Sequence, residues 1–69
     1  MINHDLLRQD IRKLKFIKGL SYQELADMTN SSYWTIAGYM SGHDTSNKLA
    51  LRIIKALRLR IEKYEDNDG

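Results

Sequence analysis

Apolar residues recur at spacings of three and four along the first part of the chain, which is the period of a helix that buries one face. One such stripe consists of Leu7, Ile11, Leu14 and Ile17. It predicts a helix over residues 4–18 with these four side chains facing a core. Gly19 follows directly, and glycine readily adopts the left-handed conformation that ends a helix.

A capping box marks the start of a second helix within Ser21-Tyr22-Gln23-Glu24. The Ser21 hydroxyl can accept a hydrogen bond from the Glu24 amide, while the Glu24 carboxylate reaches back to the Ser21 amide. Leu20 and Leu25 occupy the two positions of a hydrophobic staple. We expect a helix of about two turns from Tyr22 to Thr29, because Thr29-Asn30-Ser31-Ser32 combines a residue tolerant of left-handed backbone with two potential caps.

A third short helix is expected from Tyr33 to Met40, capped by Ser32, ended at Ser41-Gly42, and with Ile36 and Tyr39 inward. The polar residues 43–46 lead to a longer helix that starts near Asn47 and carries a broad apolar surface. One of its stripes consists of Ile54, Leu57, Ile61 and Tyr64. This stripe exceeds what a small core needs, and we expect it to form a two-fold dimer contact. Residues 65–69 are expected to be an acidic, frayed tail.

Two short helices joined by a tight turn are the arrangement of a DNA-reading unit, in which one helix braces and the next enters the major groove. The small Ala26 allows close crossing of the two helices, and Ile36 fills the angle between them. The pattern therefore predicts a helix-turn-helix.

The same region resembles a known family. The resemblance lies in Gly19-Leu20-Ser21-Tyr22-Gln23-Glu24-Leu25-Ala26, Asn30, Ser31-Ser32, Ile36 and Ser41-Gly42, and more weakly in Ile53, Ala56 and Leu57. These residues are similar to the Cro/lambda-repressor-like (XRE) helix-turn-helix family. The resemblance implies an all-α, compact, four- to five-helix lambda-repressor-like DNA-binding domain, here residues 1–64. It also implies that the helix from Tyr33 is the recognition helix and that the domain binds a double-stranded operator as a homodimer.

The resemblance assigns residues to the DNA. It places Ser32, Tyr33, Trp34 and Gly38 toward the bases, and Tyr22, Ser41, His43 and Lys48 toward phosphates. The sequence departs from the family in having Asn30 where glycine is usual, Thr29 at a normally aliphatic position, and no Lys or Arg in the unit. Phosphate attraction is therefore expected from flanking helices, through Lys15, Lys18, Lys48 and Arg52.

Charge is distributed unevenly along the 69 residues, whose net charge is only +2. Residues 1–20 carry five Lys or Arg against two Asp, and residues 48–60 carry five cations and no acid, whereas residues 21–47 hold three acids and no cation. Two basic segments thus flank a weakly acidic middle, which favours an anionic partner for the flanks.

Composition narrows the function further. The chain has no Cys, and His4 and His43 lack partners at ligand spacing, so we expect no metal site. No catalytic motif or phosphate-cradling loop is visible, and we expect neither an enzyme, nor a cofactor, nor a small-molecule ligand. Without an apolar span or a signal sequence, no membrane association is expected and a cytoplasmic location is the default.

These observations predict a sequence-specific transcriptional regulator of the phage or mobile-element repressor or Cro type, controlled by occupancy alone. A protein-binding module of the antitoxin or inhibitor type, using the same surface, is the alternative, favoured by the missing cations of the recognition helix. Trp34 can be a contact residue or a core residue of a small domain. Gly38 can reflect close approach of DNA or close packing on another helix.

Overall fold

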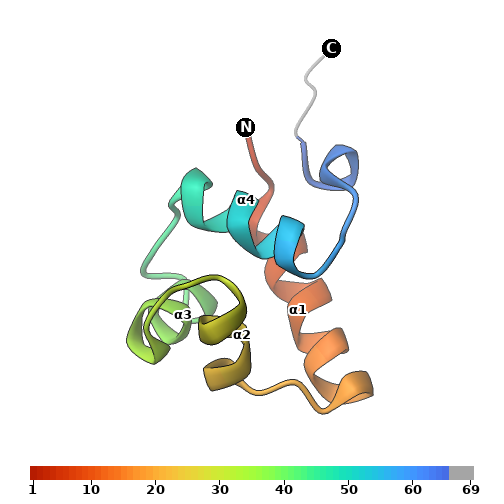
Figure 1. Ribbon diagram of the computed structural model, residues 1–69. Coiled ribbons are helices and arrows are strands. Elements are labelled where there is room, and N and C mark those ends of the chain that lie inside the picture. Colours follow the sequence, from red (N-terminus) through yellow and green to blue (C-terminus); the bar gives the residue numbers. More distant parts are fainter. Residues whose placement is uncertain (66–69) are drawn as a thin grey trace.

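The computed structural model describes residues 1–65, which form four α-helices and a short 3-10 helix around one core (Figure 1). The elements are α1 (His4–Lys18), α2 (Tyr22–Met28), α3 (Tyr33–Met40), α4 (Asn47–Ala56) and η1 (Ile61–Tyr64). Helices α2 and α3 pack against each other, α4 contacts α2, and η1 packs on α1. The expected all-α helix-turn-helix fold is confirmed.

Side chains cap the starts of all four α-helices. Asn3, Ser21, Ser32 and Ser46 each accept a hydrogen bond from a backbone amide in the first turn. The predicted capping box is present. The Ser21 hydroxyl accepts from the Glu24 amide at 3.1 Å, and the Glu24 carboxylate accepts from the Ser21 amide at 3.2 Å. These caps satisfy amides that have no partner within the helix.

The prediction of a fourth helix that continues to Tyr64 is wrong. Helix α4 ends at Ala56, and Arg58 adopts a left-handed φ of 56°. The Leu59 amide then bonds the Ile54 carbonyl at 2.9 Å and the Arg58 amide bonds the Lys55 carbonyl at 3.2 Å, which is the hydrogen-bond pair of a Schellman motif. The chain turns back there, and η1 lies against α1.

This turn changes the role of the predicted dimer stripe. Ile54 and Tyr64 are only 4% and 1% exposed. Both side chains belong to the hydrophobic core, because η1 packs on α1. The premise that the stripe is left over after the core is covered is therefore wrong for these two residues. Leu57 and Ile61 are partly buried against the same core and still reach the surface.

The inward stripe of α1 is shorter than predicted. Leu7 and Ile11 are fully buried, Leu14 is half-buried, and Ile17 is 74% exposed. The last turn of α1 lies beyond the level of α4 and η1, so neither covers Ile17 (Figure 1). The expectation that Ile17 faces the core is wrong.

The two ends of the described chain are joined. Ile2 and Glu65 form an isolated antiparallel bridge, and the Asn3 amide donates to the Tyr64 carbonyl at 2.6 Å. The expected frayed tail is therefore wrong at Glu65. The rest of that predicted tail, residues 66–69, lies outside the described residues.

Candidate functional site

The turn between α2 and α3 accommodates Thr29 and Asn30, the two residues that depart from the family pattern there. Asn30 has a φ of 54°, and the Ser31 and Asn30 amides bond the Ala26 and Asp27 carbonyls at 2.8 and 3.3 Å. Asparagine tolerates this left-handed position better than most residues other than glycine. The buried Thr29 donates its hydroxyl to the Leu25 carbonyl at 2.8 Å, so its polar atom is satisfied. Both departures from the family pattern are thus compatible with the turn.

Helices α2 and α3 meet as the sequence predicts. Ala26 and Ile36 have no exposed surface, and Tyr39 is also fully buried. The inward side of α3 is therefore occupied, which leaves its opposite side free for a partner.

Three aromatic rings line the start of α3. The Tyr22 and Tyr33 ring centroids are 6.1 Å apart, and those of Tyr33 and Trp34 are 5.3 Å apart at an interplanar angle of 89°. The Lys15 Nζ atom lies 4.8 Å from the Tyr22 ring centroid, within range of a cation–π contact. We call Lys15, Tyr22, Tyr33 and Trp34 the aromatic row. It joins α1, α2 and α3 at one surface.

The exposure of this row decides between the two interpretations of Trp34. Trp34 is 79% exposed and Tyr33 is 41% exposed. The core interpretation of Trp34 is therefore wrong, and its indole is available to a partner.

Ser32 and Gly38 complete the predicted base-facing set. The Ser32 hydroxyl accepts from the Thr35 amide at 3.1 Å and lies 2.9 Å from the Thr35 hydroxyl, so it serves as a helix cap. A Cβ atom placed on Gly38 would meet no atom of the described residues within 4 Å, apart from its own helix backbone and chain neighbours. Close packing on another helix therefore does not explain this glycine.

The end of α3 carries two of the predicted phosphate-facing residues. The exposed Ser41 hydroxyl donates to the Gly38 carbonyl at 3.0 Å and lies 2.9 Å from Nδ1 of the exposed His43. The His43 amide also bonds the Gly38 carbonyl, at 3.0 Å. These bonds hold the His43 ring beside Ser41, and none of residues 1–65 forms a hydrogen bond with its Nε2 atom.

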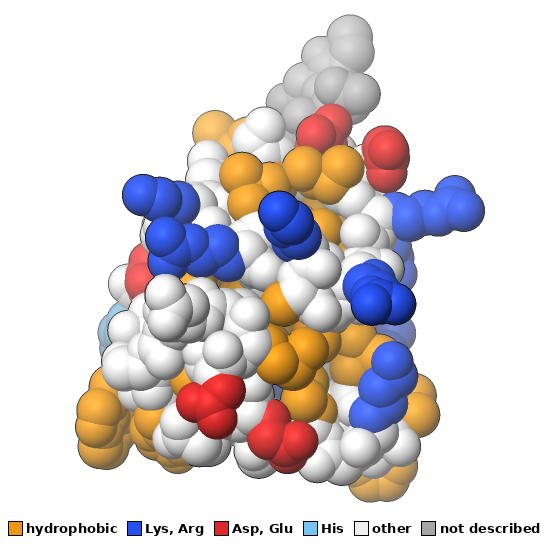
Figure 2. Space-filling model, viewed as in Figure 1, with side chains coloured by type: hydrophobic (Ala, Val, Ile, Leu, Met, Phe, Trp, Pro, Cys, Tyr) orange, Lys and Arg blue, Asp and Glu red, His pale blue; other side chains and the backbone are white. Residues whose placement is uncertain are grey.

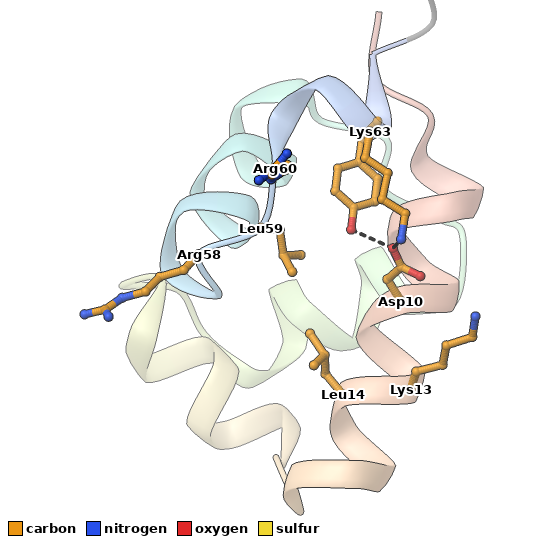
Figure 3. Close-up of a pocket in the computed structure, with 8 residues that line it drawn as sticks. Asp10, Lys13, Leu14, Arg58, Leu59, Arg60 and Lys63 are labelled. Carbon is orange, nitrogen blue, oxygen red and sulfur yellow. Dashed lines mark hydrogen bonds and ion pairs between the residues drawn. The ribbon is translucent and has the colours of Figure 1, made fainter.

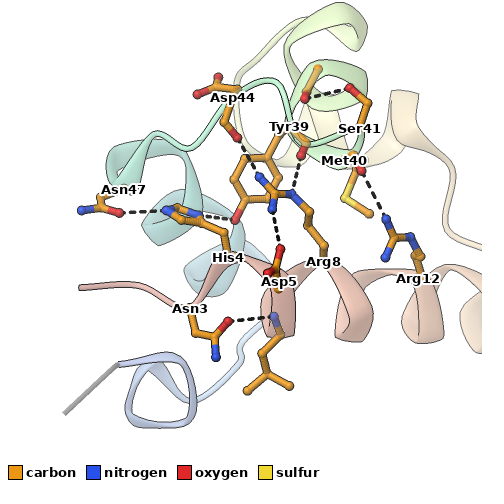
Figure 4. Close-up of polar contacts among 12 residues, drawn as sticks. Asn3, His4, Asp5, Arg8, Arg12, Tyr39, Met40, Ser41, Asp44 and Asn47 are labelled. Atoms are coloured by element: carbon orange, nitrogen blue, oxygen red, sulfur yellow. Dashed lines mark hydrogen bonds and ion pairs between the residues drawn. The ribbon is translucent and has the colours of Figure 1, made fainter. Parts of the chain in front are cut away.

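A buried arginine holds this segment in place (Figure 4). The Arg8 Nε and Nη2 atoms donate to the Tyr39 and Asp44 carbonyls at 2.6 and 2.9 Å, and Nη1 pairs with Asp5 at 3.1 Å. The role of Arg8 was not predicted from the sequence. The available signal was its position directly after Leu7 and three residues before Ile11, beside the buried stripe of α1.

His4 belongs to the same network. Its Nδ1 atom lies 2.8 Å from the Tyr39 hydroxyl and its Nε2 atom 3.0 Å from Oδ1 of Asn47 (Figure 4). Burial raises the pKa of Tyr39 to about 12, although the nearby Arg8 charge opposes the shift. Both imidazole nitrogens of His4 are thus engaged in protein contacts. Within residues 1–65 no group of ligating side chains is placed to hold a metal ion.

Cations lie on the helices that flank the helix-turn-helix. Lys18, Lys48 and Arg52 are exposed and form no ion pair with the described residues. Lys48 and Arg52 are four residues apart on α4, and they therefore share one face of that helix. In Figure 2, Lys and Arg side chains lie over α4 and near α1, whereas acidic side chains lie over α2, which carries Glu24 and Asp27.

A groove lies between α1, residues 58–60 and η1 (Figure 3). The buried Asp10 in its wall accepts from the Tyr64 hydroxyl at 2.6 Å and pairs with Lys63 at 2.7 Å. Burial alone would raise the pKa of Asp10, but the bonds from Lys63 and Tyr64 outweigh it and hold the pKa below its ordinary value. Asp10 is thus a charged structural partner that anchors η1 to α1.

A sequence model described as helix-turn-helix matches residues 11–64, which is most of the chain. No curated protein and no solved structure matched the chain significantly. Among residues 1–65, no helix has the length and apolar character needed to cross a membrane.

Proposed function

Because the chain belongs to the Cro/C1-type helix-turn-helix (XRE) family of DNA-binding regulators, we propose that it binds a specific operator as a homodimer. In this proposal it represses or switches transcription for a phage or another mobile element. The observation that carries the proposal is the exposure of Tyr33 and Trp34 at the start of α3, on the side that the core leaves free. A recognition helix reads base edges mainly with the residues of its first turns, and this supports the assignment of Tyr33 and Trp34 to the bases.

The proposed docking places α3 in the major groove. Ser32, Tyr33, Trp34 and Gly38 face the bases. The residues that face phosphates are Lys15, Lys18, Tyr22, Ser41, His43, Lys48 and Arg52. The exposure of Lys18, Lys48 and Arg52, and the position of His43 beside Ser41, support the assignment. Because α3 itself carries no cation, the flanking helices supply the electrostatic attraction.

A gel-shift series with DNA flanking the protein's own gene tests the proposal. We expect a discrete complex that survives an excess of unrelated duplex, since specific binding exceeds nonspecific binding by about 10³-fold or more. A folded protein that shifts all duplexes equally, or none, would overturn the proposal.

Replacement of Lys48 with alanine is expected to weaken binding to all sequences alike. Each neutralised phosphate contributes about −0.9 to the slope of log K against log salt, so four contacts per subunit give roughly −7 for a dimer. Lys48→Ala should flatten this slope by about one unit per subunit, measured by fluorescence anisotropy at several salt concentrations. Arg60→Ala is the matched control, because Arg60 is exposed at the groove beside η1. An equal effect of both substitutions would contradict the assignment of Lys48.

Replacement of Gly38 with alanine is expected to move stability and binding in opposite directions. The new methyl group meets no atom of the described residues outside its own helix and chain neighbours, and alanine favours a helix over glycine by about 1 kcal/mol. The melting temperature should therefore rise. If DNA packs against this side of α3, the added methyl group should lower the operator affinity because it occupies space at the contact. Unchanged or tighter binding by the stabilised variant would show that Gly38 does not face the DNA.

A homodimer is part of the proposal, with Leu57 and Ile61 in its contact. The other members of the predicted stripe, Ile54 and Tyr64, are buried. They therefore make no direct dimer contact and belong to the core against which Leu57 and Ile61 pack. Two-fold symmetry would place the recognition helices about 34 Å apart, matching a palindromic operator. Light scattering should show twice the subunit mass of 8.1 kDa at high micromolar concentration. A monomer under these conditions, with or without operator, would contradict the dimer.

A protein-binding module is the second candidate, and one observation favours it. Phe16 and Ile17 are 90% and 74% exposed at the end of α1, and no contact with DNA is assigned to either of them. Large exposed apolar side chains are typical of protein contact sites. Salt dependence discriminates the two candidates, because binding to a protein through apolar side chains stays tight when the salt concentration rises, whereas phosphate contacts weaken.

A further inference from the structure

The recognition helix lacks every side chain that reads a base pair with two hydrogen bonds. From Ser31 to Gly42 there is no Arg, Lys, Asn, Gln, Asp or Glu. Arginine or lysine on guanine, and asparagine or glutamine on adenine, supply most two-bond readout in the major groove. Discrimination by this helix must therefore come from another chemical feature of the base edges.

The exposed side of α3 offers mainly apolar surface and single hydroxyl groups. Trp34 is the most exposed large side chain of this helix, and Tyr33 stands beside it. The Tyr33 ring is held between the Tyr22 and Trp34 rings, so the apolar surface is built before any partner arrives. Gly38 lies one turn after Trp34 and adds no side chain, which leaves room for a base edge next to the indole.

Only one group in the major groove matches such a surface. The C5-methyl group of thymine is the apolar feature of the base-pair edges, and it distinguishes A·T from T·A as well as from both G·C orientations. Burial of one methyl-sized group stabilises by about 0.8 kcal/mol, which corresponds to about fourfold in affinity.

We propose that the protein selects its operator by thymine methyl groups that pack on Trp34 and Tyr33. This inference rests on the proposed function and specifies the chemistry that α3 recognises. The hydroxyl groups of α3 and the indole N–H add single hydrogen bonds, which tune the choice without the discrimination of a two-bond contact.

The test compares duplexes that differ only in these methyl groups. A random-sequence duplex library is first enriched on the full chain. The enriched pool is then amplified with either thymidine or deoxyuridine triphosphate, because uracil pairs as thymine does but lacks the methyl group. With one methyl contact in each half-site of a dimer, the uracil pool should bind more weakly by about tenfold or more.

Two variants assign the effect to residues. Trp34→Ala should reduce the difference in affinity between the two pools, because only Tyr33 then contacts the methyl groups, and its circular dichroism should stay native because the side chain is exposed. Lys48→Ala should weaken binding to both pools by the same factor, so the ratio of the affinities for the thymine and uracil pools should stay as in the wild type. Persistence of the full ratio in Trp34→Ala would overturn the assignment to Trp34.

The outcomes separate this inference from the proposed function. Enrichment followed by equal binding of the two pools would overturn the methyl readout while operator binding stands. A folded protein that enriches no sequence would overturn the proposed function and this inference together.

Discussion

Replacement of Arg8 with alanine is expected to remove most of the stability of the domain. Without the guanidinium, the part-buried Asp44 carbonyl loses its donor and the buried Tyr39 carbonyl keeps only the longer bond from the Gly42 amide at 3.2 Å. An acceptor left without a partner costs about 1–3 kcal/mol, and the truncation also empties the buried site of the Arg8 side chain. The cation–π contact of Arg8 with the Tyr39 ring, 4.8 Å from its centroid, is lost as well. A domain of this size rarely exceeds about 3–5 kcal/mol in total, so a large unfolded fraction should be visible by circular dichroism at 37 °C.

Arg12→Ala is the matched control for this prediction. Arg12 lies one turn further along α1, is exposed, and makes a single longer bond of 3.3 Å to the Met40 carbonyl. Its removal should change the free energy of unfolding by no more than about 0.5 kcal/mol. If both variants have the same urea midpoint, the Arg8 network does not stabilise the junction of α3 and the following loop.

The second large effect is expected in alkaline solution. Burial raises the pKa of Tyr39 to about 12, so the folded state favours the neutral phenol over the phenolate. The resulting stabilisation is complete below pH 10, the ordinary tyrosine pKa, and is lost as the pH rises through 12. At about 1.4 kcal/mol per pH unit, the loss reaches about 3 kcal/mol. Burial and the hydrogen bond to the Asp10 carboxylate also raise the pKa of Tyr64, which adds to the effect.

Urea titrations between pH 8 and pH 12 measure this loss, and tyrosinate absorbance reports ionisation at the same time. Tyr39→Phe removes the bond to His4, so the variant should be less stable than the wild type by about 1 kcal/mol at neutral pH. It also removes the titrating group, so its free energy of unfolding should fall less steeply between pH 10 and pH 12. Tyr64→Phe should flatten the profile in the same way. A wild-type stability that does not change up to pH 12 would contradict the prediction.

Local signals in the sequence predicted the helix-turn-helix well. The bounds of α2 and α3 follow from Ser21, Ser32 and Gly42, whose effects act within one helical turn. The left-handed backbone at Asn30 was also predictable, because few residues tolerate it. Caps and turns are decided by neighbouring residues, and a sequence pattern can therefore reveal them.

The end of α4 could not be predicted for a tertiary reason. Arg58 is a good helix former, and the apolar spacing through Tyr64 continues the period of α4. The helix nevertheless stops, because η1 gains burial of Tyr64 and its bond to Asp10, 54 residues away in the chain. A contact at that separation leaves no periodic signal.

The candidate site was only partly visible in the sequence. The position of Trp34 in the recognition helix was predicted from the family resemblance, but its exposure depends on how α3 packs. The row that Lys15, Tyr22 and Tyr33 form beside it joins three helices, and spacing within any one of them does not reveal it. Arg8 was missed because a charged residue is rarely buried, and its carbonyl partners carry no side-chain signature.

The bridge between Ile2 and Glu65 determines where attached sequences leave the domain. Ile2 and Glu65 lie side by side at one edge, while α2 and α3 lie at the opposite end of the molecule (Figure 1). A fluorescent protein fused to either terminus should therefore leave the recognition helix unobstructed.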